Sequence, residues 1–203
     1  MFTGIVQGVG EIIDIIDQNK LRTYRIKLPE HLAENIEIGA SIANDGCCLT
    51  VTSFSEQCVT FDIMEETLAL TTLGTKKVGD FVNIERSAKF GDEVGGHIMS
   101  GHISCVAKIT HINQTETNCM MTLTMPEQFM KYVLYKGFIG IDGASLTIGD
   151  IHQNQFNLHL IPETLAITTL KDKKLNDLVN IEIDSQTQAI VDTVERVLQA
   201  KGQ

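Results

Sequence analysis

The stretch ETLALTTLGTKKVGDFVNIE at residues 66–85 returns at residues 163–182 as ETLAITTLKDKKLNDLVNIE. The two stretches agree at 14 of 20 positions without a gap, whereas ordinary composition would give roughly one or two agreements. The same offset of 97 residues aligns residues 4–6 with 101–103, 28–30 with 125–127, and 45–51 with 142–148. A constant offset through four blocks indicates one duplicated module rather than a repeat array, because only two copies exist.

Each module carries the pattern of a small β protein. The segment LRTYRIKL alternates, with Tyr24, Ile26 and Leu28 on one face. Further short runs rich in Val, Ile, Thr and Phe are CLTVTSF, CVTFDI and FVNIE in the first copy and SLTIGDI, FNLHLI and LVNIE in the second. Turn signals such as NDG at residues 44–46 and IDG at 141–143 separate them. So many short strands in about 90 residues predict a small closed barrel for each module.

Helices are expected only at a few places. PEHLAENI at residues 29–36 and PEQFMKYV at 126–133 can each form a short helix opening at proline. ETLALTTL is expected to be a short helix or a turn. After Ser185, the apolar residues Ile190, Val194, Val197 and Leu198 recur at helical spacing. A helix this short is marginal alone, so the apolar stripe either docks on its own barrels or joins copies from other chains.

Composition excludes several classes of function. A net charge of −10 and a pI near 5.0 argue against a nucleic-acid partner. The apolar runs are too short to span a membrane, and MFTGIVQGVGEI has no secretory signal pattern, which favours the cytoplasm. Five cysteines, two of them adjacent, predict free thiols, and the absence of a CxxC pair argues against zinc. The charged run KDKK at residues 171–174 is expected to be a solvated turn.

Five ordered segments resemble the riboflavin synthase family of the alpha-chain type: MFTGIV, NDGCCLTV, GGHIMSGHI, YKGFIGIDGASLTI and HLIPETL. The similarity extends from Met1 to the terminal helix. It implies an all-β fold with two homologous six-stranded Greek-key barrels, at residues 1–97 and 98–185, and a C-terminal α-helix at 186–203 that makes a homotrimer. It also implies a dismutation in which one 6,7-dimethyl-8-ribityllumazine gives a four-carbon unit to another, without a metal or redox cofactor.

The implied chemistry gives the duplication a physical reason. Two identical substrates must meet face to face, so a lumazine-binding barrel copied once supplies both pockets, and catalysis is largely proximity. In the family, the N-terminal barrel of one subunit meets the C-terminal barrel of its neighbour.

The resemblance also implies the pocket residues, as three segments per module. In the first module they are Gly4, Ile5 and Val6; Cys48, Leu49 and Thr50; and Asp62, Ile63, Met64, Glu65, Glu66 and Thr67. In the second module they are Gly101, His102 and Ile103; Ser145, Leu146 and Thr147; and His159, Leu160, Ile161, Pro162, Glu163 and Thr164, with Lys136 nearby. Glycine permits close backbone approach, and backbone amides, threonine hydroxyls and glutamates suit a pteridine edge and ribityl hydroxyls.

The chemistry is expected where the two copies differ. Cys48 stands opposite Ser145, and Ile5 stands opposite His102. Histidine can move a proton at neutral pH, and a serine or cysteine can add to an activated ring carbon. Following the family, the reaction centre is assigned to Ser145, Thr147, His102 and Cys48, with Ser41 in a supporting proton relay and Phe2 closing over a ring.

Plainer interpretations remain open for these residues. Gly4 and Gly101 can mark bulges, the threonines can be mere strand formers, and Cys48 can be a small buried apolar residue. His97 and His102 lie too irregularly for a metal site. His31, His111 and His152 are expected at the surface, and Met99 is expected to pack.

Two other functions fit parts of the pattern. A non-catalytic lumazine or flavin carrier, such as the fluorescent lumazine proteins, needs one working pocket, whereas here the second copy keeps its pocket segments. A flavoprotein reductase domain is disfavoured because no GxGxxG nucleotide-binding half follows.

Overall fold

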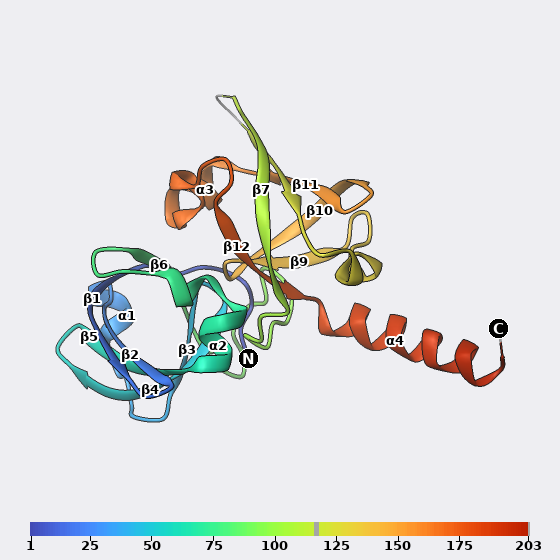
Figure 1. Ribbon diagram of the computed structural model, residues 1–203. Coiled ribbons are helices and arrows are strands. Elements are labelled where there is room, and N and C mark those ends of the chain that lie inside the picture. The colour runs from blue at the N-terminus through green and yellow to red at the C-terminus, as the bar shows by residue number, and fades with distance from the viewer. Residues whose placement is uncertain (116–117, 203) are drawn as a thin grey trace.

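The computed structural model describes residues 1–115 and 118–202, and its strands close into two barrels joined side by side (Figure 1). The first barrel consists of β1 Gly8–Gln18, β2 Leu21–Lys27, β3 Ser41–Asn44, β4 Cys47–Ser55, β5 Cys58–Met64 and β6 Phe81–Arg86. The second consists of β7 Cys105–Gln114, β8 Cys119–Thr124, β9 Phe138–Ile141, β10 Ala144–His152, β11 Gln155–Leu160 and β12 Leu178–Ile183. The strands neighbour one another in the orders 1-2-5-4-3-6 and 7-8-11-10-9-12, so the prediction of two equivalent six-stranded barrels is confirmed.

Each barrel closes around its own apolar core because its strands alternate. Tyr24 and Ile26 of β2 are fully buried while Arg25 between them is exposed, as the sequence pattern predicts. The Tyr24 hydroxyl donates to the carbonyl oxygen of Leu73, which satisfies its polar end inside the core. In the second barrel, Phe156 and Leu158 of β11 fill the equivalent interior.

Short helices connect the strands at equivalent places. α1 Glu30–Ala33 follows Pro29, and the 3₁₀ helix η2 Glu127–Tyr132 follows Pro126, so both expected helices exist with proline one residue before the first turn. The ETL segments form α2 Glu65–Leu70 with η1 Thr72–Thr75, and α3 Pro162–Ile167 with η3 Thr169–Asp172.

Two segments outside the strands lie against the barrel of the other module. Residues 1–6, here called the first crossover segment, reach the second barrel, where Ser145 N donates to Gly4 O at 2.8 Å and Val6 joins the core. Residues 98–104, the second crossover segment, reach the first barrel, where Cys48 N donates to Gly101 O at 2.8 Å. The two segments pair where they pass, through Phe2 and Met99.

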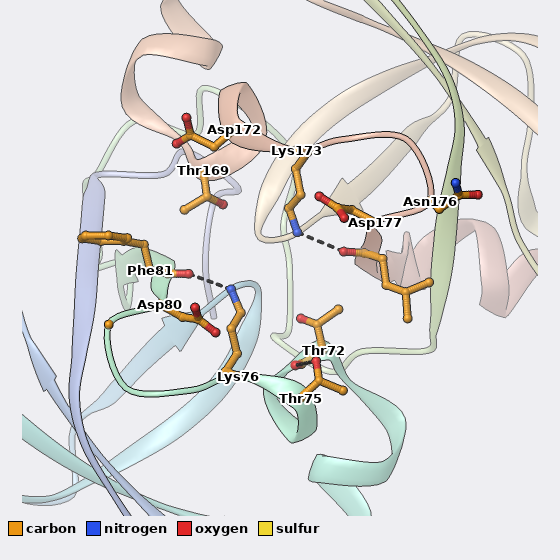
Figure 2. A pocket seen from close by; sticks show the side chains of 12 residues that line it. Thr72, Thr75, Lys76, Asp80, Phe81, Thr169, Asp172, Lys173, Asn176 and Asp177 are labelled. Atoms are coloured by element: carbon orange, nitrogen blue, oxygen red, sulfur yellow. Dashed lines mark hydrogen bonds between the residues drawn. The ribbon is translucent and has the colours of Figure 1, made fainter.

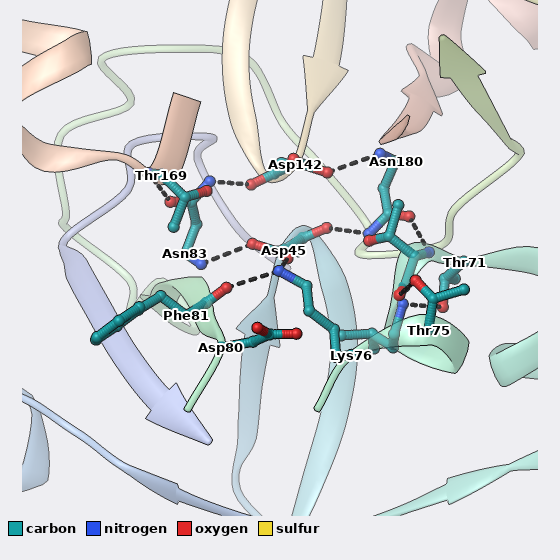
Figure 3. Close-up of polar contacts among 12 residues, drawn as sticks. Asp45, Thr71, Thr75, Lys76, Asp80, Phe81, Asn83, Asp142, Thr169 and Asn180 are labelled. Atoms are coloured by element: carbon teal, nitrogen blue, oxygen red, sulfur yellow. Dashed lines mark hydrogen bonds and ion pairs between the residues drawn. The ribbon is translucent and has the colours of Figure 1, made fainter. Parts of the chain in front are cut away.

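Residues of the two repeated stretches bond to the opposite copy between the barrels (Figure 3). The Asn83 side chain donates to Asp142 O at 2.9 Å and accepts from Thr169 N at 2.7 Å. The Asn180 side chain makes the equivalent bonds to Asp45 O at 2.9 Å and from Thr72 N at 2.7 Å. The interface is therefore pseudo-symmetric, because each copy binds the other through residues at equivalent positions.

Two hairpin turns meet at the centre of this interface. Asp45 and Gly46, and likewise Asp142 and Gly143, have positive φ, as a tight hairpin turn requires. A Cβ atom built on Gly46 would lie 2.7 Å from the backbone nitrogen of Gly143. Glycine is needed here both for the turn and for the close approach of the two barrels.

A buried ion pair stands behind each turn. Lys76 Nζ lies 2.8 Å from Asp45 Oδ2, and Lys173 Nζ lies 2.7 Å from Asp142 Oδ2, with both carboxylates fully buried. Burial lowers the pKa of Lys173, but the Asp142 and Asp45 carboxylates raise it by more, so it stays above its ordinary value. The expectation that the run 171–174 is a solvated turn is therefore wrong at Lys173, because the turn folds this side chain inward.

A cavity of about 600 Å³ opens beside these ion pairs (Figure 2). Six residues from each copy line it, in equivalent pairs that begin with Thr72 and Thr169 and end with Phe81 and Leu178. None of the predicted substrate residues borders it. The cavity follows from the pseudo-symmetric packing of the repeats.

Replacing Lys173 by methionine is expected to destabilise the chain by about 3–5 kcal/mol, because Asp142 is left buried and charged without its partner. The matched control is Lys171→Met, since Lys171 is exposed in the same run and is expected to change stability little. Urea unfolding of the two variants measures the difference. Equal stability would show that the Lys173 ion pair contributes nothing.

The final helix, α4 Ser185–Ala200, leaves the second barrel and points away from both barrels (Figure 1). Asp184 caps its first turn, and Lys131 Nζ binds Asp192 and Glu195 at 3.2 and 2.5 Å. The predicted stripe of Ile190, Val194, Val197 and Leu198 stays 42–66% exposed, so docking of the stripe on the chain's own barrels is wrong. Within the described residues, no helix has the length and apolarity needed to cross a membrane.

Candidate active site

The first site lies on the outward face of the first barrel. Val51 of β4 pairs with Phe61 of β5, which places the exposed Thr50 and Asp62 next to each other. Ser41 of β3 pairs with Thr50 on its other side, and the start of α2 carries Glu66 and Thr67. The Asp62 carboxylate is held by the Thr23 hydroxyl at 2.6 Å.

The second site repeats this arrangement on the second barrel. Ile148 of β10 pairs with Leu158 of β11, which places the exposed Thr147 and His159 next to each other. Phe138 pairs with Thr147 at the position that Ser41 takes in the first site. The Lys136 backbone has positive φ, and its amide donates to Ile148 O at 2.9 Å, so Lys136 lies at the edge of this site.

The expected grouping of pocket segments by module is wrong for one segment in each site. Gly4, Ile5 and Val6 belong to the second site, because Gly4 bonds to Ser145 and Val6 packs in the second core. Gly101, His102 and Ile103 belong to the first site, because Gly101 bonds to Cys48 and Ile103 packs against the first core. Each site is therefore built from both modules.

Five of the predicted substrate residues point into the barrel cores. They are Val6, Leu49, Ile63, Leu146 and Leu160, each at most 9% exposed. Alternation along the strands turns Leu49, Ile63, Leu146 and Leu160 inward while their neighbours face out. Val6 precedes β1 and packs into the second core from the first crossover segment. Such residues can offer a ligand only their backbone atoms.

The two crossover glycines are required by close approach. Gly4 and Gly101 have φ of 74° and 81°, and neither lies in a strand. A Cβ built on Gly4 would lie 2.5 Å from Ser145 Cβ, and one on Gly101 would lie 2.5 Å from Cys48 Cβ. The bulge interpretation is therefore wrong, and the close approach that requires glycine is to the side chains of Ser145 and Cys48.

Phe2 does not lie over an open pocket. Its side chain is 1% exposed and packs with Ala43, Met99 and Cys48 where the crossover segments pass each other. The expectation that its ring closes over a ligand is therefore wrong in the single chain. Met99 packs, as expected.

His97 is the main site residue that the sequence reasoning missed. Its Nδ1 lies 2.6 Å from the hydroxyl of Ser145, and its ring stacks on Phe138 with centroids 5.2 Å apart. Burial lowers the pKa of His97, although Asp184 nearby raises it somewhat. The imidazole is therefore neutral at neutral pH, and its Nδ1 can accept the Ser145 proton.

Among the described residues, no histidine hydrogen-bonds to the Cys48 side chain in the way that His97 bonds to Ser145. The printed sequence does not show this pair, because His97 and Ser145 lie 48 residues apart and meet only in the folded chain. His102 is exposed on the second crossover segment, and His31, His111 and His152 are exposed as expected.

All five cysteines are free thiols. Burial raises the pKa of Cys47 and of Cys105 to about 12, which makes both unreactive at neutral pH. Cys48 is only half-buried, so the interpretation of a buried apolar residue does not describe it. In the part of the chain that the structure describes, no three His, Cys, Asp or Glu side chains group as metal ligands.

Similarity to known proteins covers both barrels. The family model described as Lumazine binding domain matches residues 3–87 and again 100–184. Riboflavin synthase of Escherichia coli is 55% identical over 202 residues, which are 99% of this chain and 95% of that protein. The yellow fluorescent protein of Aliivibrio fischeri is 42% identical over 93% of this chain and 98% of its own length. The crystal structure of LumP complexed with 6,7-dimethyl-8-(1'-D-ribityl) lumazine superposes with a TM-score of 0.83 and 29% identity, covering 91% of this chain and all of LumP.

Proposed function

The chain belongs to the lumazine-binding domain family and, within it, to the riboflavin synthases, and on this premise we propose how its two sites share the reaction. The enzyme converts two molecules of 6,7-dimethyl-8-ribityllumazine into riboflavin and 5-amino-6-(D-ribitylamino)uracil by transfer of a four-carbon unit. The observation that carries the proposal is the presence of two equivalent outward sites, each completed by a crossover segment from the other module. A reaction that joins two copies of one molecule needs two such sites close together.

The second site supplies the nucleophile in this proposal. Ser145 Oγ loses its proton to His97 Nδ1 and adds to an activated ring carbon of one lumazine. Thr147 and Lys136 border the same ligand, and the exposed Glu163 at the start of α3 suits its ribityl hydroxyls.

The first site supplies the carbanion. A proton leaves the acidic C7 methyl group of the second lumazine, and the resulting carbanion attacks its partner. His102 is the proposed base because it stands exposed on the second crossover segment, beside Cys48. Ser41 and Thr50, paired across β3 and β4, are the proposed relay, and Glu66 is the proposed ribityl ligand.

We also propose that three chains assemble through α4. The exposed stripe of Ile190, Val194 and Val197 needs an apolar partner, and the same stripe on other copies provides one. The first site of one subunit would then face the second site of its neighbour. The domains proposed from the sequence, 1–97, 98–185 and 186–203, act as two lumazine-binding barrels and a trimerisation helix, in the cytoplasm.

A carrier of lumazine or flavin is the alternative, favoured by the similarity to the yellow fluorescent protein. A carrier needs no base beside Ser145, whereas here His97 is placed 2.6 Å from it. The test is to incubate the purified protein with 6,7-dimethyl-8-ribityllumazine alone and to follow riboflavin absorbance. Riboflavin formation is expected; tight binding without product would favour the carrier, and no binding would refute both functions.

The pair of Ser145 and His97 predicts a distinct pH dependence. As the pH falls through the lowered pKa of His97, the imidazole gains a proton and can no longer accept one, so kcat should fall only below the ordinary histidine pKa of about 6.5. His97→Asn should lower kcat by roughly 10²–10⁴-fold and remove this acid limb. His111→Asn is the exposed control, and a pH–rate profile unchanged by His97→Asn would refute the role.

A further inference from the structure

Each repeated stretch ends in a buried glutamate that the proposed reaction does not use. Glu85 and Glu182 close the sequence VNIE in the two copies and are 3% and 4% exposed. Glu85 Oε1 accepts from Thr3 N at 2.6 Å and from the Thr3 hydroxyl at 2.8 Å, and its Oε2 accepts from Gly4 N at 3.1 Å. All these donors lie in the first crossover segment.

Glu182 repeats the arrangement on the second crossover segment. Its Oε1 accepts from Ser100 N at 2.6 Å and from the Ser100 hydroxyl at 2.9 Å, and its Oε2 accepts from Gly101 N at 3.1 Å. Every hydrogen-bond partner of the two carboxylates is therefore a donor. An ionised carboxylate, which only accepts hydrogen bonds, suits all of them. Burial raises the pKa of both glutamates, and these hydrogen bonds lower it in part.

Each glutamate is connected through a single glycine residue to the candidate site on the other barrel. Glu182 binds the amide of Gly101, whose carbonyl accepts from Cys48 N in the first site at 2.8 Å. Glu85 binds the amide of Gly4, whose carbonyl accepts from Ser145 N in the second site at 2.8 Å. Each glutamate lies on a strand of one barrel, β6 or β12, and fixes a segment that completes the site of the other.

We propose that Glu85 and Glu182 are positioning residues with crossed effects: Glu85 places Gly4 and Ile5 at Ser145, and Glu182 places Gly101 and His102 at Cys48. The proposal rests on the proposed function, since it names what aligns the two sites of that reaction. Glutamine at either position would turn an amide NH₂ group against a backbone N–H, leaving the crossover segment without one acceptor.

The test uses the full-length chain with Glu182→Gln and Glu85→Gln, and it combines kinetics with amide hydrogen exchange at Cys48 and Ser145. We expect Glu182→Gln to raise exchange at the Cys48 amide at least about tenfold and to leave Ser145 unchanged, with the reverse in Glu85→Gln. Each variant should also lose at least about tenfold in turnover. A purely structural role would loosen both amides together.

Equal changes at both amides in both variants, or wild-type exchange in both, would overturn the proposal. Should a glutamine variant fail to fold, Ser100→Ala and Thr3→Val remove only one hydroxyl donor each. They should give the same crossed pattern of amide exchange with smaller changes. The absence of that pattern would also overturn the proposal. A wild-type chain that forms no riboflavin would refute the proposed function, while the exchange pattern would still decide the positioning.

Discussion

Replacing Ser145 by alanine is expected to lower kcat by roughly 10²–10⁴-fold while leaving riboflavin binding nearly unchanged. The variant removes the hydroxyl that lies 2.6 Å from His97 Nδ1, but it keeps the backbone amide that bonds to Gly4 O. The second site therefore keeps its shape and loses its nucleophile. Steady-state kinetics with 6,7-dimethyl-8-ribityllumazine and equilibrium titration with riboflavin separate the two effects.

Cys48→Ser is the matched control, since it puts the hydroxyl of the second site into the first. No histidine in the described residues hydrogen-bonds to the Cys48 side chain, so this change should cost much less than Ser145→Ala. Equal and negligible losses in both variants would contradict the division of labour proposed for the two sites.

Removing residues 186–203 is expected to give monomers whose turnover is lower by about 100-fold or more, because two lumazines would no longer be held against each other. The first and second sites would remain intact on each chain but would lose the facing site of a neighbour. Analytical ultracentrifugation gives the mass, and the riboflavin assay gives the rate.

A point variant tests the proposed contact between α4 helices while changing less of the chain. Val194→Asp puts a charge into the exposed stripe, and Gln199→Asp puts one on another face of the same helix. Only the first should dissociate the assembly. Full activity in a monomer would refute a site shared between chains.

The two barrels were predictable because the sequence patterns that specify their strands and turns are local and occur in both copies. Alternation in β2, the NDG and IDG turns, and the constant offset of 97 residues each point to the same strands in both copies. The helical spacing of Ile190 and Val194 likewise predicted α4, whose first turn Asp184 caps.

The exchange of crossover segments could not be predicted in this way. Residues 1–6 and 98–104 lie outside the strands, so no alternation records which barrel they pack on. Their place depends on long-range bonds, from Gly4 to Ser145 and from Gly101 to Cys48. The same exchange buries Phe2, which the family resemblance placed over a ligand.

His97 and Lys173 were misjudged for a related reason. For both, the deciding contact is with a residue far away in the sequence, Ser145 for His97 and Asp142 for Lys173. A charged run or an isolated histidine looks like surface when the sequence does not show that partner.

The pseudo-symmetric interface also bears on how the two copies have evolved since the duplication. The Asn83 side chain bonds to the backbone of Asp142, and the Asn180 side chain bonds to the backbone of Asp45. A substitution in one copy therefore breaks a bond to the other copy, which has not changed. Mutational drift at this interface is therefore restrained in both copies at once. Cys48 and Ser145 make none of these interface bonds, and the two copies differ at this position, as the separate chemical roles proposed for them require.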